Sequence, residues 1–148
     1  MKIKTYVIPF MMSCSLMSTA NISHAASIEQ GEIVFKKGYV SGAVKGSVIR
    51  GDSDHYSLIA GAGQWMEVTI SSLEDNAVFA VTAYSYGSGE DIPIAGNTEV
   101  GTGYWYGRLP NPAYSKNGKQ NALDFYVMGS RGNTSYKMTV KIKNKSWK

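Results

Sequence analysis

Cysteine is almost absent from this sequence of 148 residues, and histidine is rare. The single cysteine, Cys14, and one of the two histidines, His24, lie in the first 25 residues. If that segment is removed on export, the remaining chain has no thiol, which excludes disulfides, thiol catalysis and thiolate metal sites. His55 alone cannot provide a tetrahedral zinc site. We therefore expect neither a metal nor a cofactor.

No apolar run is long enough to span a bilayer, which needs roughly 20 residues. A short basic start at Met1–Lys4 is followed by a weakly apolar, uncharged stretch, residues 5–20, and then by Ser23-His24-Ala25. This order is typical of a cleaved secretion signal. We predict a signal peptide over residues 1–25, one domain over residues 26–148, a periplasmic or secreted location, and no membrane insertion after cleavage.

The alternative for the N-terminus is a lipoprotein anchored through Cys14. Residues 10–13, Phe-Met-Met-Ser, lack the leucine and the small pair expected of a lipobox. We therefore favour a cleaved signal over a lipid anchor.

No apolar stretch has helical spacing, whereas alternation with period two is frequent. The clearest example places Tyr136, Met138, Val140 and Ile142 on one face and lysines on the other. The stretch before it likewise places Leu123, Phe125 and Val127 on an inward face. Such alternation indicates half-buried strands. The strands expected on this basis lie near residues 32–36, 44–49, 56–60, 65–71, 77–84, 104–108, 123–128 and 136–142. Short strands with glycine-rich turns predict an all-β antiparallel sandwich or a closed barrel.

The sequence contains no catalytic constellation. His55 follows Asp52-Ser53-Asp54 directly, and adjacent residues of one turn cannot form a hydrolytic triad. There is no Gly-x-Ser-x-Gly elbow, and the residues after Asp54 begin a strand rather than a calcium loop. The paired acids Glu74-Asp75 and Glu90-Asp91 fall in loop-like contexts. We predict that the protein is not an enzyme.

The excess of lysine near the C-terminus has a simple explanation. Lys137, Lys141 and Lys143 alternate with apolar residues, as on the solvent face of a strand. Nucleic-acid binding would require stacking aromatic residues on a second element beside them. We expect no nucleic-acid partner.

Aromatic residues gather around two long connections, residues 85–103 and 110–120. The residues concerned are Tyr84, Tyr86, Tyr104, Trp105, Tyr106 and Tyr114. Tyrosine and tryptophan are common at binding hot spots, but some of these rings are equally suited to the core. One candidate function is therefore a non-catalytic carbohydrate or cell-surface binding module that uses Tyr86, Tyr104, Trp105 and Tyr106.

Several segments resemble a known family. Phe35–Gly38, Ser41–Gly46, Ile49–Tyr56 and Ala62–Gln64 resemble the first half of the periplasmic inhibitors of goose-type (g-type) lysozyme. The second half is similar in Asn76–Phe79, Gly107–Pro110, Tyr126–Arg131 and Ser135–Val140. The likeness covers nearly all of the processed chain, and its motifs are shared with the wider class of pre-peptidase C-terminal-like domains.

The resemblance implies a single antiparallel β-sandwich of about eight strands. It also implies an inhibitor that inserts loops into the cleft of g-type lysozyme and so protects the bacterial cell wall from a host or competitor enzyme. The positions matching the two inhibitory loops are Asp52, Ser53, Asp54, Tyr56, Arg131, Asn133 and Thr134. The second loop departs from the pattern, because it keeps one arginine, Arg131, and is shortened. The sequence does not predict an oligomeric state.

Overall fold

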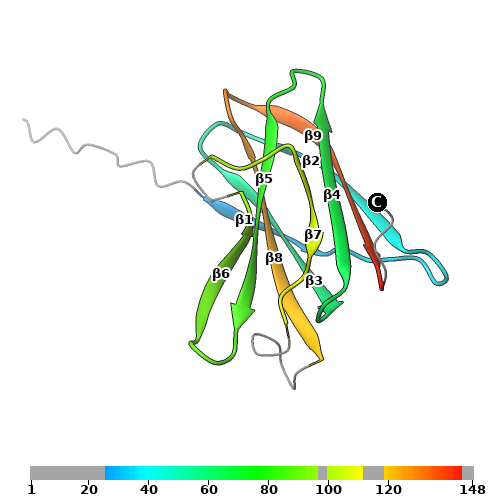
Figure 1. Ribbon diagram of the computed structural model, residues 1–148. Coiled ribbons are helices and arrows are strands. Elements are labelled where there is room, and N and C mark those ends of the chain that lie inside the picture. The colour runs from blue at the N-terminus through cyan, green and yellow to red at the C-terminus, as the bar shows by residue number, and fades with distance from the viewer. Residues whose placement is uncertain (1–25, 97–99, 112–118, 145–148) are drawn as a thin grey trace, which may run out of the picture.

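The computed structural model describes residues 26–96, 100–111 and 119–144, and these form nine strands (Figure 1). The strands are β1 (Ser27–Glu32), β2 (Ser41–Val48), β3 (Ser53–Gly61), β4 (Trp65–Ser72), β5 (Ala77–Ser85), β6 (Glu90–Ala95), β7 (Tyr104–Arg108), β8 (Gln120–Gly129) and β9 (Thr134–Lys143). The described residues contain no helix, so none of them provides a helix that could cross a membrane. The predicted signal peptide lies outside the described residues.

The strands form two sheets that pack face to face. One sheet has five strands in the order β1-β3-β8-β5-β6, and the other has four in the order β2-β9-β4-β7. The chain crosses between the sheets at most connections, so neighbours in a sheet are often distant in sequence. The predicted all-β sandwich is confirmed.

The observed strands differ from the expected ones in three details. There are nine where about eight were expected, because β6 lies inside the connection expected over residues 85–103. The strand expected near residues 32–36 lies earlier in the chain and ends at Glu32 as β1. β6 is an edge strand that contains Pro93, and a proline is tolerated at an edge because its missing N–H costs no ladder bond there. The sheets are also not wholly antiparallel, since β1 pairs with β3 in the parallel sense.

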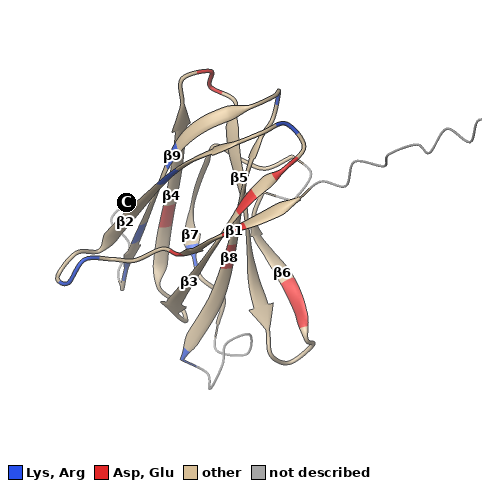
Figure 2. Ribbon diagram, turned by 180° about the vertical axis from the view of Figure 1, so that it is seen from behind, with Lys and Arg blue, Asp and Glu red and all other residues tan. Residues whose placement is uncertain are grey.

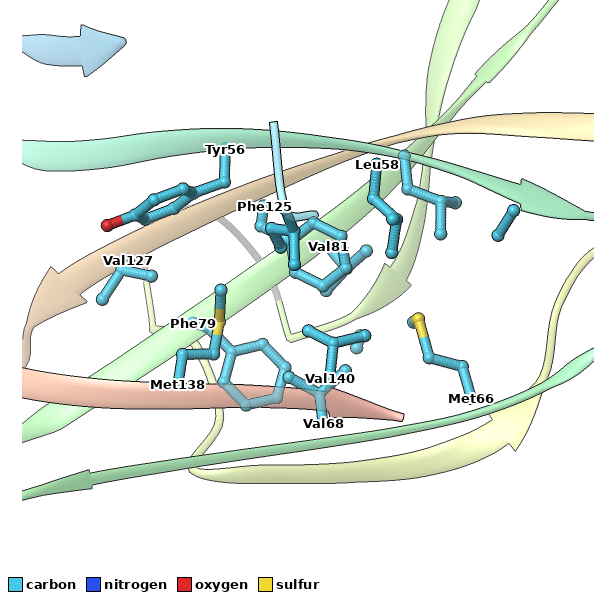
Figure 3. Packing of buried hydrophobic residues seen from close by; sticks show 14 of the residues in the cluster. Tyr56, Leu58, Met66, Val68, Phe79, Val81, Phe125, Val127, Met138 and Val140 are labelled. Atoms are coloured by element: carbon cyan, nitrogen blue, oxygen red, sulfur yellow. The ribbon is translucent and has the colours of Figure 1, made fainter. Parts of the chain in front are cut away.

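The core lies between the two sheets and follows the predicted alternation (Figure 3). The inward positions of β8 and β9 are buried as expected: Leu123, Phe125, Val127, Tyr136, Met138, Val140 and Ile142. Phe79 and Val81 of β5 belong to the same buried cluster as Met66 and Val68 of β4. A core of this size holds the connecting turns on a rigid frame.

Candidate functional site

Three turns meet at one end of the sandwich: residues 49–52 between β2 and β3, 73–76 between β4 and β5, and 130–133 between β8 and β9. We call this region the loop end. The Arg50 N–H donates to Asn133 Oδ1 at 2.8 Å, and Asn76 Nδ2 donates to the Asn133 carbonyl at 3.1 Å. The Ser130 N–H donates to the Asn76 carbonyl at 2.8 Å. The three turns are therefore bonded into one unit.

Arg131 projects from this unit and is oriented by it. Its side chain is exposed, and Nη2 donates to the carbonyls of Asp75 at 3.2 Å and Glu74 at 3.5 Å. Asp75 has a positive φ of 48°, which turns the backbone back toward β5. The bonds use one guanidinium nitrogen and leave the charge at the surface.

The shortness of the β8–β9 turn depends on glycine. A Cβ at Gly129 would overlap the carbonyl oxygen of Gly132, and Gly132 itself has φ 137°. Only glycine permits both the close approach and this dihedral. The turn is thus compact, and it holds Arg131 and Asn133 close to the end of the β-sandwich.

The other predicted loop residues divide into surface and buried positions. Asn133 is exposed, while Asp52 and Ser53 are half-buried. Asp54, Tyr56 and Thr134 are buried, with 1%, 5% and 3% of their surfaces exposed. A direct contact of these three side chains with a partner does not fit the structure, because they lie on the inward side of β3 and β9.

Asp54 and Tyr56 instead belong to a buried hydrogen-bond network below the loop end. Tyr136 donates its hydroxyl proton to Asp54 Oδ2 at 2.6 Å, so Tyr56 must donate to the Tyr136 oxygen, 2.7 Å away. Gln30 Nε2 donates to Asp54 Oδ1 at 3.0 Å. Burial and the bond to Asp54 raise the pKa of Tyr136 far above its usual 10.

This network ties the two sheets together close to the turn that carries Arg50. Asp54 and Tyr56 belong to the five-stranded sheet and Tyr136 to the four-stranded sheet. β2 passes over the network at Gly46, where a Cβ would lie 2.5 Å from the Tyr136 oxygen and 2.7 Å from Asp54 Oδ2. Asp54 and Tyr56 therefore bond the two sheets to each other beneath the loop end.

Sequence reasoning missed three surface residues here. Arg50 is exposed on the β2–β3 turn, Leu73 is 95% exposed on the β4–β5 turn, and Ile49 is 61% exposed beside Arg50. A surface depression of about 260 Å³ lies between these turns and is lined by Ile49, Glu74 and Asn133 among others. No local motif marks Leu73 or Arg50, because their proximity arises only when the turns meet.

The four aromatic residues of the alternative binding module do not form one surface. Trp105 packs against the core, whereas Tyr104 and Tyr106 alternate to the outer side of β7. Tyr86 makes an edge-to-face contact with Tyr84, at the end of β5 in the other sheet. Tyr114 lies outside the described residues. The single platform predicted from the sequence is therefore wrong.

His55 does not sit in a turn, as the sequence suggested, but on the outer face of β3. Nδ1 pairs with Glu29 of β1, Nε2 pairs with Asp124 of β8 at 2.8 Å, and the ring stacks on Tyr126. Partial burial alone would lower the pKa of His55, but the two carboxylates outweigh it and raise the pKa above 6.5.

This arrangement is structural rather than catalytic. The two carboxylates hold opposite sides of the ring, which leaves neither ring nitrogen for a nucleophile or a metal. Among the described residues, no group of three or more histidine, cysteine or acidic side chains is placed to hold a metal ion. The acids Glu74, Asp75, Glu90 and Asp91 are all exposed, in keeping with solvated positions, but Glu90 and Asp91 lie on β6 and not in the loop expected from the sequence.

Comparisons with known proteins connect this architecture to a family. No protein-family model matches the chain, and no curated protein matches it significantly by sequence. Among solved structures, the periplasmic inhibitor of g-type lysozyme from Aeromonas hydrophila aligns with a TM-score of 0.55 and 30% identity, covering 79% of this chain and 99% of that chain.

Two further inhibitors share the fold. A mutant of the Escherichia coli inhibitor aligns with a TM-score of 0.50 and 20% identity, and the Salmonella Typhimurium inhibitor with 0.50 and 19%. Each alignment covers 80% of this chain and 99% of the other. The Aeromonas relative is described as an inhibitor, in agreement with the prediction that this protein is not an enzyme. By its identity to the Aeromonas protein over most of both chains, the chain belongs to the family of periplasmic inhibitors of g-type lysozyme.

Proposed function

We propose that this protein inhibits g-type lysozyme by placing the loop end over the active-site cleft of the enzyme. The observation that carries the proposal is the bonding of three turns into one unit that presents two arginines and two exposed aliphatic side chains. Such a surface combines cationic and apolar contacts at the same end of a rigid sandwich.

The chemistry of the target suits an arginine. Glycoside hydrolases of the lysozyme type carry an essential carboxylic acid in a cleft. A guanidinium pairs with a carboxylate through charge-assisted, often bidentate hydrogen bonds, which a lysine cannot reproduce. Arg131 is our choice for this contact, because the carbonyls of Glu74 and Asp75 already fix its direction.

Preorganisation is the main advantage of the loop end. Ordering a flexible loop on binding costs free energy, and a loop already fixed avoids that cost. Asn133 holds the β2–β3 turn through Arg50, and the network of Asp54, Tyr56 and Tyr136 supports it from below. The affinity should therefore depend on buried residues that never touch the enzyme.

The proposed contact set differs from the one that the family resemblance implies. Arg131, Asn133 and Asp52 remain in it, and Arg50, Ile49 and Leu73 are added. Asp54, Tyr56 and Thr134 are removed from the contact set and are assigned a supporting role. Exposed aliphatic side chains of this kind provide apolar contact area around a central charged group.

We also propose export to the periplasm with cleavage after Ala25. The backbone nitrogen of Ala26 donates to Asp52 Oδ1 at 3.0 Å. Cleavage would turn this nitrogen into an ammonium group and the contact into a charge-assisted bond at the loop end. The intact mass of the protein recovered from a periplasmic extract tests this, since it should correspond to a chain that starts at Ala26.

The test of function is the clearance of bacterial cell walls by g-type lysozyme, with chicken-type and invertebrate-type enzymes alongside. The protein should slow only the g-type enzyme. Arg131→Ala should weaken inhibition by about 10- to 100-fold. Arg131→Lys should restore little of it, because only the planar guanidinium can form two parallel hydrogen bonds to a carboxylate.

The matched control is Lys36→Ala, which removes one charge from an exposed loop away from the loop end. It should inhibit like the unmodified protein. If no enzyme is slowed, or if Lys36→Ala fails as badly as Arg131→Ala, the proposal is wrong.

A further inference from the structure

The two sheets carry opposite charge. The strands of the five-stranded sheet contain no lysine or arginine, whereas acids occur on β1, β3, β6 and β8. The strands of the four-stranded sheet contain five cations and one acid. The cations are Lys45, Lys137, Lys141, Lys143 and Arg108, and the acid is Glu67. Figure 2 shows this division as blue segments on β2, β7 and β9 and red segments on β1, β6 and β8.

The cations lie on the outer face of their sheet. Met138, Val140 and Ile142 of β9 are buried, so the alternating Lys137, Lys141 and Lys143 point to solvent, and all three are exposed. We call this outer side of β2, β9, β4 and β7 the basic face.

One pair of lysines on the basic face is unfavourable for folding. Lys45 of β2 stands directly opposite Lys137 of β9, and both are exposed. Like charges opposite each other on paired strands destabilise a sheet. The stability of the fold therefore does not explain this pair.

Aromatic rings accompany the lysines on the same face. Trp65 of β4 stacks on Tyr106 of β7 with 5.3 Å between the ring centroids and 20° between the planes. Trp65 is also directly opposite Lys143 of β9. Cations and rings thus lie side by side across three neighbouring strands.

The single acid of the face is used to organise it. Glu67 accepts a hydrogen bond from the Tyr104 hydroxyl at 3.1 Å and pairs with Lys141 at 3.1 Å. It fixes one ring and one ammonium group, and the strands of this sheet carry four further cations. The sequence had suggested an ordinary solvated strand face, but the aromatic residues that a binding interpretation requires are present on β4 and β7.

We propose that the basic face binds a glycan strand whose sugars carry carboxylate groups. The ammonium groups pair with carboxylates, and the rings offer flat apolar surfaces for the faces of the sugar rings. A flat sheet side suits an extended polymer. The site begins beside the loop end, where Lys137 and Leu73 line one surface depression, and runs along the sheet to Trp65 and Lys143 at its other end.

Two other polyanions fit less well. Insertion into an anionic membrane uses large apolar side chains beside the basic residues, yet the outward positions of β2 and β9 are serine, threonine, lysine and Ala43. Nucleic acid shares the demand for cations and rings, but the export proposed above would place the domain among envelope glycans. The glycan is therefore the occupant that we test.

The test uses polygalacturonate, in which each sugar carries a carboxylate, and dextran as an uncharged glycan, with binding measured by calorimetry. We expect binding to polygalacturonate that weakens with added salt, and none to dextran. Lys45→Ser combined with Lys137→Ser should weaken binding by about tenfold. Trp65→Ala should weaken it to a similar degree through loss of the stacking surface.

The matched control is Lys36→Ser combined with Lys37→Ser, which changes the net charge equally but lies in the loop before β2. It should bind polygalacturonate like the unmodified protein. Equal loss in both double variants would overturn the proposal in favour of a net-charge effect. Absence of polygalacturonate binding would overturn it too, as would equal or tighter binding to oligodeoxythymidylate or to phosphatidylglycerol vesicles.

Lysozyme inhibition separates this inference from the proposed function. Trp65→Ala changes the end of β4 that is remote from the loop end, so it should inhibit g-type lysozyme as the unmodified protein does. Loss of inhibition in this variant would contradict the separation of Trp65 from the lysozyme contact.

Discussion

The two sheets of this protein use their charged residues in different ways. On the five-stranded sheet, His55 lies between Glu29 of β1 and Asp124 of β8, and each carboxylate pairs with one of its ring nitrogens. On the four-stranded sheet, Lys45 faces Lys137 and only one acid serves five cations. The first arrangement is explained by stability. The second is not, and such an arrangement suggests an interaction with something outside the chain.

The loop end lies at the junction of both sheets and depends on the contacts between them. The network of Asp54, Tyr56 and Tyr136 joins the sheets just below it. The end that we assign to the enzyme is therefore built on contacts between sheets, whereas the basic face is built within one sheet. Variants at the junction and on each face should separate these contributions.

The largest expected effect is at the junction of the sheets. Gly46→Ala should destabilise the protein by about 1–3 kcal/mol, because the added Cβ forces apart the Tyr136 hydroxyl and the Asp54 carboxylate. Inhibition should weaken with it. Gly103→Ala is the control, since a Cβ there meets nothing within 4 Å. Chemical denaturation measures both, and equal stability of the two variants would show that the network does not constrain β2.

An intermediate effect is expected on the five-stranded sheet. The pKa of His55 is raised above 6.5 in the folded protein, so its stabilisation is complete below about pH 6.5 and is lost as the pH rises through the folded pKa. His55→Gln should therefore cost about 1 kcal/mol near pH 5.5 and much less near pH 8.5. Thermal midpoints across this range, compared with those of the unmodified protein, measure the difference. A difference that grows with pH would contradict the ion-pair account.

The smallest expected effect has the opposite sign and belongs to the four-stranded sheet. Lys45→Ser combined with Lys137→Ser should leave the stability unchanged or raise it by up to about 1 kcal/mol, because it removes like charges from opposite positions. Chemical denaturation at low and high salt measures this, and the gain should shrink at high salt. A clear loss of stability would mean that the two lysines have structural roles.

The sequence predicted those parts of the fold that depend on local alternation. β8 and β9 have strict period-two patterns, and their inward faces were identified correctly. β6 was missed because it is a short edge strand with a proline, and the parallel pairing of β1 depends on residues of β3 far along the chain. Such pairings are decided by tertiary contacts rather than by local pattern.

The candidate site was predictable only where it depends on local alternation along a strand. The alternation of Tyr56, Leu58 and Ala60 already places Asp54 on the inward side of β3, so its burial follows from the pattern. The proximity of Arg50 and Leu73 to Arg131 does not, because three separate turns must meet. The basic face likewise depends on the register that puts Trp65 beside Lys143.

The central claim is that the loop end occupies the cleft of g-type lysozyme, and competition tests it most directly. The affinity of the protein for the enzyme is measured by calorimetry, with and without a saturating chitooligosaccharide in the cleft. The account predicts that the saccharide weakens binding in proportion to its occupancy, because both ligands need the same space. Equal affinity in the presence and absence of the saccharide would mean that the protein binds elsewhere on the enzyme and would contradict the account.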